Sequence, residues 1–209
     1  MNVAAVGLLP TNPLTGTWFR AIQPQHWVSS LKTSHTRVIS SRFNPSAAAS
    51  PQFSLLYLAE NPIVALFEAQ AVFGSTTSPP GIIPHPLRAF VTINVRVQLD
   101  EVADLSDPSH QLLLGTTAQE LTGDWNGYHA RSASTPVSAP IAPAPTQELG
   151  MALSSRTTLE GFMTVSAKVP IYRNLVVFPQ NLGARSFLEF ENTASGVKSR
   201  IDRNHPDGS

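Results

Sequence analysis

Residues 91–99 carry the most regular pattern in this chain. Apolar side chains occupy the odd positions from Val91 to Leu99, and polar side chains occupy the even positions from Thr92 to Gln98. A period of two residues places successive side chains on opposite faces of a β-strand. The pattern therefore predicts a strand with one solvent-exposed face. We expect this strand near an edge of its sheet or beside a mobile loop.

The segment 61–74 is apolar enough for a buried helix, yet it contains one carboxylate, Glu68. Asn61 is a suitable N-cap, Pro62 fits the first helical position and Gly74 is a stop signal. At about 100° per residue, Glu68 would project among apolar side chains, where a charge is costly unless the fold supplies a cation or hydrogen-bond donors. Glu68 is therefore either paired or kept available for chemistry.

Shorter signals predict the remaining elements. We expect strands at residues 17–22, 54–59, 163–168, 174–178 and 187–190. The pair Asp107-Pro108 and the capping box at 117–120 predict one or two short helices within residues 107–122, and residues 147–162 predict another. Residues 132–146, rich in Ala, Pro and Ser, predict a surface loop.

These elements are interleaved without a regular βαβ period, which favours an α+β fold with a mixed β-sheet core and flanking helices. We expect one domain over residues 1–190, followed by a polar tail, residues 191–209, that frays. The strand at 54–59 runs almost directly into the Glu68 helix, so Tyr57 and Glu68 can face a common cleft. Arg20 is an isolated charge among large apolar side chains of the first strand.

The composition excludes several classes of function. The 14 basic and 14 acidic residues cancel, so bulk charge would not attract nucleic acid or an anionic membrane. With no cysteine, disulfides, thiolate nucleophiles and Cys-based zinc sites are excluded, and the six histidines lack the i, i+4 spacing of a helical metal site. No signal peptide, membrane span, dinucleotide fingerprint, P-loop or serine-hydrolase motif occurs. We expect a soluble, cytoplasmic protein without a metal.

Several separated stretches of sequence, in this order, resemble the RES domain, a family named for an arginine, a glutamate and a serine. They are Thr-Trp-Phe-Arg at 17–20, Ser-Arg-Phe-Asn-Pro at 41–45, Leu-Tyr-Leu-Ala-Glu-Asn-Pro at 56–62 leading to Glu68, and the stretches 160–168 and 173–179. The resemblance extends over residues 16–185. The chain departs from the family where a glycine-rich Gly-Arg-Trp-Asn-Pro turn is usual, and in its Pro-rich insert.

Residue by residue, the resemblance places the family's arginine on Arg20, its glutamate on Glu68 and its serine on Ser166, which implies that these three are catalytic. It implies that further polar positions, Arg42, Tyr57 and Asn44, bind substrate. The family is similar in fold to ADP-ribosyltransferases. Many members are toxins that degrade NAD⁺ and are neutralised by an antitoxin similar to Xre-type repressors. NAD⁺ would then be a substrate, with no cofactor, and a homodimer stays open.

The implied activity suits these residue types. Glu68 can stabilise the oxocarbenium ion that forms when nicotinamide leaves ribose, as in glycoside hydrolysis. Arg20 and Arg42 can clamp the pyrophosphate, Tyr57 can stack on a ring, and Ser166 can hold an amide or a hydroxyl. The acceptor is water or phosphate. Two alternatives stay open: a protein ADP-ribosyltransferase, and a non-catalytic binding module in which Glu68 only neutralises Arg20.

Overall fold

The alternating segment forms β5 (Val91–Asp104), the strand that connects most of the central sheet. It pairs antiparallel with β1 (Thr11–Ile22) and with β8 (Phe187–Asn192), and parallel with β6 (Gly161–Val165). The alternation is confirmed, because the odd positions from Ile93 onward are buried. The expected place near a sheet edge is wrong from Arg96 onward, because there β5 has strand partners on both of its sides; residues 91–95 pair with β1 alone.

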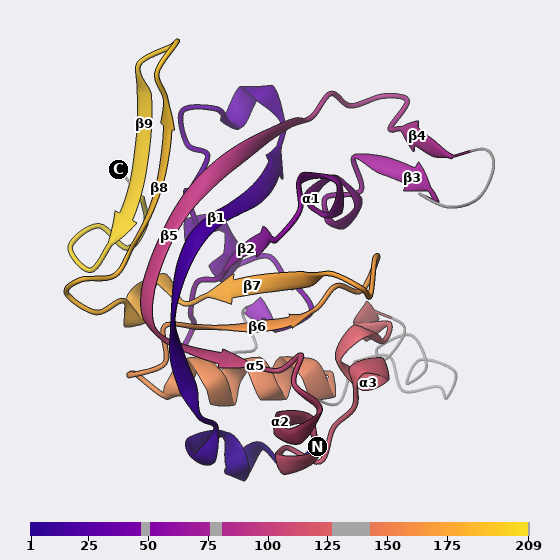
Figure 1. The fold of residues 1–209 in the computed structure, drawn as a ribbon, viewed down its shortest axis with the longest axis vertical. Helices are drawn as coiled ribbons and strands as arrows, with labels where there is room; N and C mark the ends of the chain where they lie inside the picture. The colour runs from indigo at the N-terminus through magenta and orange to yellow at the C-terminus, as the bar shows by residue number, and fades with distance from the viewer. Residues whose placement is uncertain (47–50, 76–80, 127–142, 209) are drawn as a thin grey trace.

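The computed structural model describes residues 1–46, 51–75, 81–126 and 143–208. Within these residues, seven strands follow the order β1-β2-β7-β6-β5-β8-β9, and the extra pairing of β1 with β5 closes the first five into a ring (Figure 1). The remaining strands of this sheet are β2 (Leu56–Ala59), β7 (Arg173–Val177) and β9 (Val197–Asp202). The fold is therefore a single mixed α/β domain built on a β-sheet core, as the sequence predicts.

The described α-helices are short and lie against the sheet (Figure 1). They are α1 (Pro62–Glu68), α2 (Pro108–Leu113), α3 (Ala118–Thr122) and α5 (Pro145–Ser155), with 3₁₀ turns η1 (Val3–Leu8), η2 (Pro24–His26), η3 (Ser34–Arg37) and η5 (Pro179–Asn181). The sequence predicts one or two short helices within residues 107–122, and the structure has two there, α2 and α3. Both N-caps form, since Asp107 accepts from Ser109 N at 2.7 Å and Thr117 accepts from Glu120 N at 3.2 Å. The reciprocal half of the capping box predicted at 117–120 does not form, because Glu120 Oε2 accepts from Thr116 Oγ1 at 2.7 Å instead.

Two helices differ in length from the prediction. The Glu68 helix ends at Glu68 rather than near Gly74, because Gln70 adopts a left-handed backbone with φ 55° and the chain then enters β3 (Val72–Gly74), which pairs with β4 (Ile82–Pro84). The helix expected at 147–162 is α5, which begins earlier, at Pro145, and ends at Ser155. The expected loop at 132–146 lies mostly outside the described residues, and its last two positions belong to α5.

The polar C-terminal segment contributes β9 to a β-hairpin with β8, so the prediction that this tail frays is wrong for its described residues, 191–208. β9 pairs with β8 over six residue pairs. Charged side chains on one face stabilise the hairpin: Glu189 is 5% exposed and is paired with Arg96, Lys198 and Arg200. The Arg200 guanidinium also lies 4.3 Å from the centre of the Phe187 ring. A polar sequence here reflects cross-strand ion pairs, which composition alone does not reveal.

No helix among the described residues is long and apolar enough to cross a membrane.

Candidate active site

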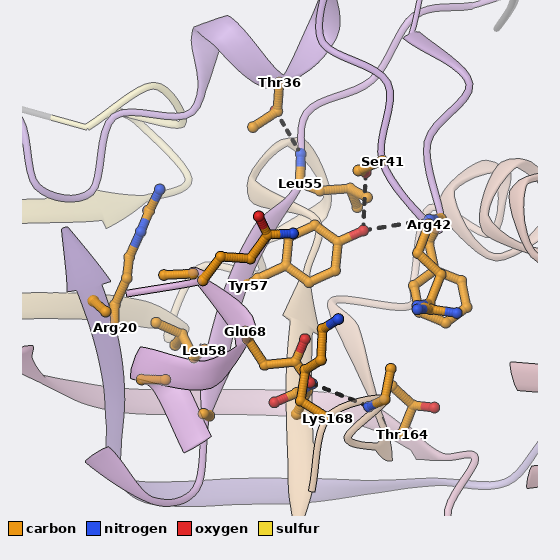
Figure 2. A pocket seen from close by; sticks show the side chains of 18 of the residues that line it. Arg20, Thr36, Ser41, Arg42, Leu55, Tyr57, Leu58, Glu68, Thr164 and Lys168 are labelled. Carbon is orange, nitrogen blue, oxygen red and sulfur yellow. Dashed lines mark hydrogen bonds between the residues drawn. The ribbon is translucent and has the colours of Figure 1, made fainter. Parts of the chain in front are cut away.

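A cavity of about 460 Å³ opens between β1, β2, α1 and the β6–β7 pair. Its size is within the usual range for small-molecule sites. Figure 2 shows Arg20, Tyr57, Glu68 and Lys168 around it. The polar and aromatic side chains that line it include Arg20, His35, Ser41, Arg42, Tyr57, Glu68, Asp124, Trp125, Thr164, Lys168 and Asn174. Tyr57 and Glu68 thus face a common cleft, as predicted.

Glu68 is the last residue of α1, where the helix dipole disfavours a negative charge. Its Oε1 atom accepts three hydrogen bonds: from Ser166 Oγ at 2.5 Å, from Ala167 N at 3.1 Å and from Asn174 Nδ2 at 2.7 Å. No donor among the described residues is paired with its Oε2 atom. One oxygen of the carboxylate is therefore anchored to the β6–β7 region, and the other is available to a ligand in the cavity.

Arg20 lies on β1, away from Glu68 in the close-up view (Figure 2). Its Nη1 atom is buried and has no hydrogen-bond partner, and no acidic side chain among the described residues is paired with it. Burial lowers the pKa of Arg20 to about 10, so the guanidinium still carries its charge at neutral pH. The structural ion pair between Arg20 and Glu68, considered from the sequence, does not form. A half-buried cation with a buried, unpartnered Nη1 atom is costly, and an anionic ligand would remove that cost.

Tyr57 lies on β2 with its ring in the middle of the pocket (Figure 2). Its hydroxyl shares a hydrogen bond with Ser41 Oγ at 3.0 Å and accepts a second one from Phe43 N at 3.3 Å. Burial raises the pKa of Tyr57 to about 12, so the phenol stays neutral. Because the hydroxyl is already occupied, the ring face is the part of Tyr57 that a ligand would meet.

Arg42 lies on the opposite side of Tyr57 from Arg20 in the close-up view (Figure 2). Its Nη1 atom donates to the carbonyls of Leu121, at 3.3 Å, and of Gly123. Burial lowers the pKa of Arg42, while the nearby Glu68 charge acts in the opposite direction. Arg42 thus connects its turn to the end of α3 and lines the cavity with a guanidinium that is partly occupied.

Two predicted site residues lie behind the cavity wall. Ser166 is fully buried, and its hydroxyl accepts from Val169 N at 3.0 Å while donating to Glu68. Asn44, predicted to bind substrate, instead braces its own turn: Nδ2 donates to Thr36 O at 2.9 Å and to Phe53 O at 3.0 Å. With 1% exposure and its hydrogen bonds made inside the protein, Asn44 is not among the residues that line the cavity.

The turn that carries Arg42 is fixed from the other side by α5. Gln147 Nε2 donates to Ser40 Oγ and to Ser41 O, both at 3.0 Å. Gly150 of α5 packs directly under the turn, since a Cβ there would lie 1.8 Å from Phe43 O. The rim that differs from the family's usual glycine-rich turn is therefore held by a helix distant in sequence.

Several cavity residues were not predicted from the sequence, among them His35, Trp125, Lys168 and Asn174. Lys168 and Asn174 lie close in sequence to Ser166. Their place at the cavity depends on the pairing of β6 with β7, which the sequence does not reveal. Burial, followed by repulsion from Arg20, lowers the pKa of His35, which places this ring near the same end of the cavity. Trp125 is a single tryptophan after a short helix, and no sequence pattern around it indicates a binding site.

The cavity has more positive than negative groups, although the chain as a whole is neutral. Arg20, Arg42 and Lys168 line it together with two carboxylates, Glu68 and Asp124, which gives three minus two, or one excess positive charge before His35 is counted. Within the described residues, no cluster of three or more His, Cys, Asp or Glu side chains could hold a metal ion. The arrangement suits an anionic ligand that presents a developing cation to Glu68.

Both the fold and the sequence of this chain resemble those of known proteins. The chain resembles one chain in the crystal structure of the M. tuberculosis MbcT–MbcA toxin–antitoxin complex, with a TM-score of 0.63 at 17% sequence identity, over 98% of this chain and 93% of that chain. At this identity the likeness establishes the fold. No curated protein gives a significant match to the sequence. The sequence model of the RES domain matches residues 17–189, which include every residue named at the cavity. The chain therefore belongs to the RES domain family.

Proposed function

We propose that this protein is an enzymatic toxin that cleaves the bond between nicotinamide and ribose in NAD⁺. One observation carries the proposal: Glu68 is anchored through Oε1, has no described donor at Oε2, and lines the same cavity as Arg20, a cation whose Nη1 atom is buried without a partner. That combination fits a substrate with an anionic part and a carbon that becomes cationic during reaction. NAD⁺, with its pyrophosphate and its pyridinium ribose, has both.

In the proposed reaction, the bond from ribose C1′ to the pyridinium nitrogen breaks and both of its electrons stay with nicotinamide, which leaves as a neutral molecule. The positive charge moves to the ribose as an oxocarbenium ion, which Glu68 Oε2 stabilises. An oxygen of water then bonds to C1′ and releases a proton to solvent, or an ionised oxygen of phosphate bonds to C1′ without releasing one. Neither a metal nor a thiol is needed for these steps.

The other cavity residues fit supporting parts. Arg20 would bind the pyrophosphate, because charge-assisted hydrogen bonds would satisfy its Nη1 atom. The Tyr57 ring would stack on a planar part of the substrate. Arg42 would shape the wall near Trp125 rather than clamp the pyrophosphate with Arg20, since its guanidinium already binds two carbonyls.

The direct test is incubation of the purified protein with NAD⁺ labelled in the adenosine part. Free ADP-ribose identifies water as the acceptor, and ADP-ribose 1-phosphate formed in phosphate buffer identifies phosphate. Label retained on a protein supports the alternative, a protein ADP-ribosyltransferase. Unchanged NAD⁺ under all of these conditions contradicts an NAD⁺-cleaving enzyme and favours a binding module.

Ser166→Ala should lower kcat about tenfold and leave KM for NAD⁺ nearly unchanged. The substitution removes the shortest of the three hydrogen bonds to Glu68 Oε1, so the carboxylate loses its fixed orientation while the substrate contacts stay in place. Steady-state kinetics and a melting curve for both proteins check this. A rise in KM with kcat unchanged would show that Ser166 acts on substrate binding instead.

We also propose that a neighbouring antitoxin of the Xre-like class neutralises the protein by filling the cavity. The structural match to a chain of a toxin–antitoxin complex supports a partner of this kind. The positive cavity would accept an acidic or carboxyl-terminal group of the partner near Arg20, which excludes NAD⁺ by competition.

To test occlusion, the protein is co-expressed with the product of the neighbouring gene, and NAD⁺ is titrated against the purified complex. Competition predicts that the apparent Kd for NAD⁺ rises in proportion to partner concentration. Inhibition of cleavage with an unchanged Kd would place the partner at a remote site. Absence of any complex would contradict the toxin–antitoxin assignment while leaving the NAD⁺ assay valid.

A further inference from the structure

Thr164 and Asn174 form a polar pair on the cavity wall that the proposed reaction does not yet use. They are direct partners across β6 and β7, and both line the cavity. Thr164 is 3% exposed and Asn174 is 9% exposed. Thr164 Oγ1 and Asn174 Oδ1 are both buried without a hydrogen-bond partner. Two adjacent unsatisfied polar atoms at the same site are unusual, because buried polar groups are nearly always paired.

Buried polar atoms without a hydrogen-bond partner are concentrated at this cavity. Six buried side-chain atoms in the described residues have no hydrogen-bond partner, and three of them, on Arg20, Thr164 and Asn174, belong to residues that line this one cavity. Each unsatisfied buried group costs about 1–3 kcal/mol. This placement is expected when the partners are supplied by a ligand rather than by the protein.

The orientation of the Asn174 amide is fixed by Glu68. Its Nδ2 atom donates to Glu68 Oε1 at 2.7 Å, so Oδ1 points away from the carboxylate and can only accept. The Thr164 hydroxyl can donate or accept. Side chains of directly opposed residues are about 5 Å apart at Cβ, so one ligand group with separate donor and acceptor atoms can bridge the pair.

We propose that Thr164 and Asn174 form a subsite for a ligand group that both donates and accepts hydrogen bonds, and that this group is the carboxamide of nicotinamide. The amide N–H donates to Asn174 Oδ1, and the amide carbonyl accepts from the Thr164 hydroxyl. This assignment rests on the proposed function for the identity of the substrate. It would place the leaving group beside Glu68, because Asn174 contacts that carboxylate directly.

A ribose hydroxyl could supply the same hydrogen bonds, so the experiment compares two dinucleotides that share the ribose. NAD⁺ has a carboxamide, and 3-acetylpyridine adenine dinucleotide has a methyl ketone, which keeps the carbonyl and lacks the N–H donor. The measured quantity is the ratio of kcat/KM for NAD⁺ to kcat/KM for the ketone. Asn174→Ala weakens the anchoring of Glu68 for both substrates alike, and the ratio removes that shared effect.

We expect Asn174→Ala to lower this ratio about tenfold, the value of one lost hydrogen bond to a buried acceptor. Thr164→Val should lower kcat/KM about tenfold for both dinucleotides, because both retain the carbonyl. Thr146→Val is the matched control, since Thr146 is 4% exposed, also has an unpartnered hydroxyl and lies on α5 outside the cavity. It should leave the rates and the ratio at wild-type values.

An unchanged ratio in Asn174→Ala, with both rates reduced in Thr164→Val, would overturn the carboxamide assignment in favour of a ribose hydroxyl. Wild-type rates in a folded Thr164→Val protein would overturn the subsite altogether. If the wild-type protein leaves NAD⁺ intact, the proposed function fails independently. Titration of nicotinamide and 3-acetylpyridine against the wild-type and Asn174→Ala proteins, followed by NMR, then still tests the subsite, because binding needs no turnover.

Discussion

Glu68→Gln is expected to slow NAD⁺ cleavage at least about a hundredfold, equivalent to about 2.7 kcal/mol of transition-state stabilisation, while the protein stays folded. The glutamine carbonyl can take the place of Oε1 and keep the donors Ser166, Ala167 and Asn174. Its neutral amide then replaces Oε2 at the cavity, so the charge is lost and the architecture is kept. Release of nicotinamide and a melting curve measure both properties.

The matched control for this substitution is Glu148→Gln, because Glu148 is an exposed carboxylate on α5 that does not line the cavity. It should cleave NAD⁺ at the wild-type rate. Near wild-type turnover in folded Glu68→Gln would remove Glu68 from the chemistry and leave it the role of closing the β6–β7 turn onto α1.

Arg20→Met is expected to weaken NAD⁺ binding about a hundredfold, to leave nicotinamide binding unchanged, and to raise the melting temperature of the ligand-free protein. Only the dinucleotide has the pyrophosphate that would satisfy the guanidinium. The gain in stability follows from the sign of the pKa shift. Burial lowers the pKa of Arg20 to about 10, so at neutral pH the guanidinium is charged in both states but loses part of its hydration only in the folded state.

Calorimetric titration of both ligands and a melting curve without ligand test this prediction, with Arg88→Met as the control for loss of an exposed positive charge. Equal weakening of NAD⁺ and nicotinamide would mean that Arg20 supports the shape of the site. A large fall in melting temperature would mean that the guanidinium stabilises the fold, in conflict with its lack of a partner.

Patterns with a local cause were predictable from the sequence. The alternation in β5 and the caps of α1, α2 and α3 depend on neighbouring residues, and each appears in the structure. Tyr57 and Glu68 share a cleft because β2 leads into α1 through only a few residues.

Features set by distant partners were not predictable. β5 has strands on both sides because β1 and β8, which are far apart in sequence, pair with it. The composition of β5 does not indicate these pairings. The early end of α1 depends on the left-handed conformation of Gln70, a residue with no strong preference for it. The roles of Asn44 and Asn174 could have been exchanged on sequence grounds. Only the strand register shows that Asn174 reaches Glu68 and that Asn44 faces the protein interior.

The anchoring of Glu68 has a consequence for synthesis of the protein. Asn174 lies 106 positions after Glu68, and Ser166 lies 98 positions after it, so the carboxylate leaves the ribosome long before its donors are translated. At about 5–20 residues per second, that interval lasts roughly 5–20 seconds. A nascent or truncated chain that ends before β7 has an unoriented Glu68 and an incomplete ring of strands. The proposed cleavage of NAD⁺ therefore requires translation to pass β7, and we expect chains that terminate before β7 to lack that activity.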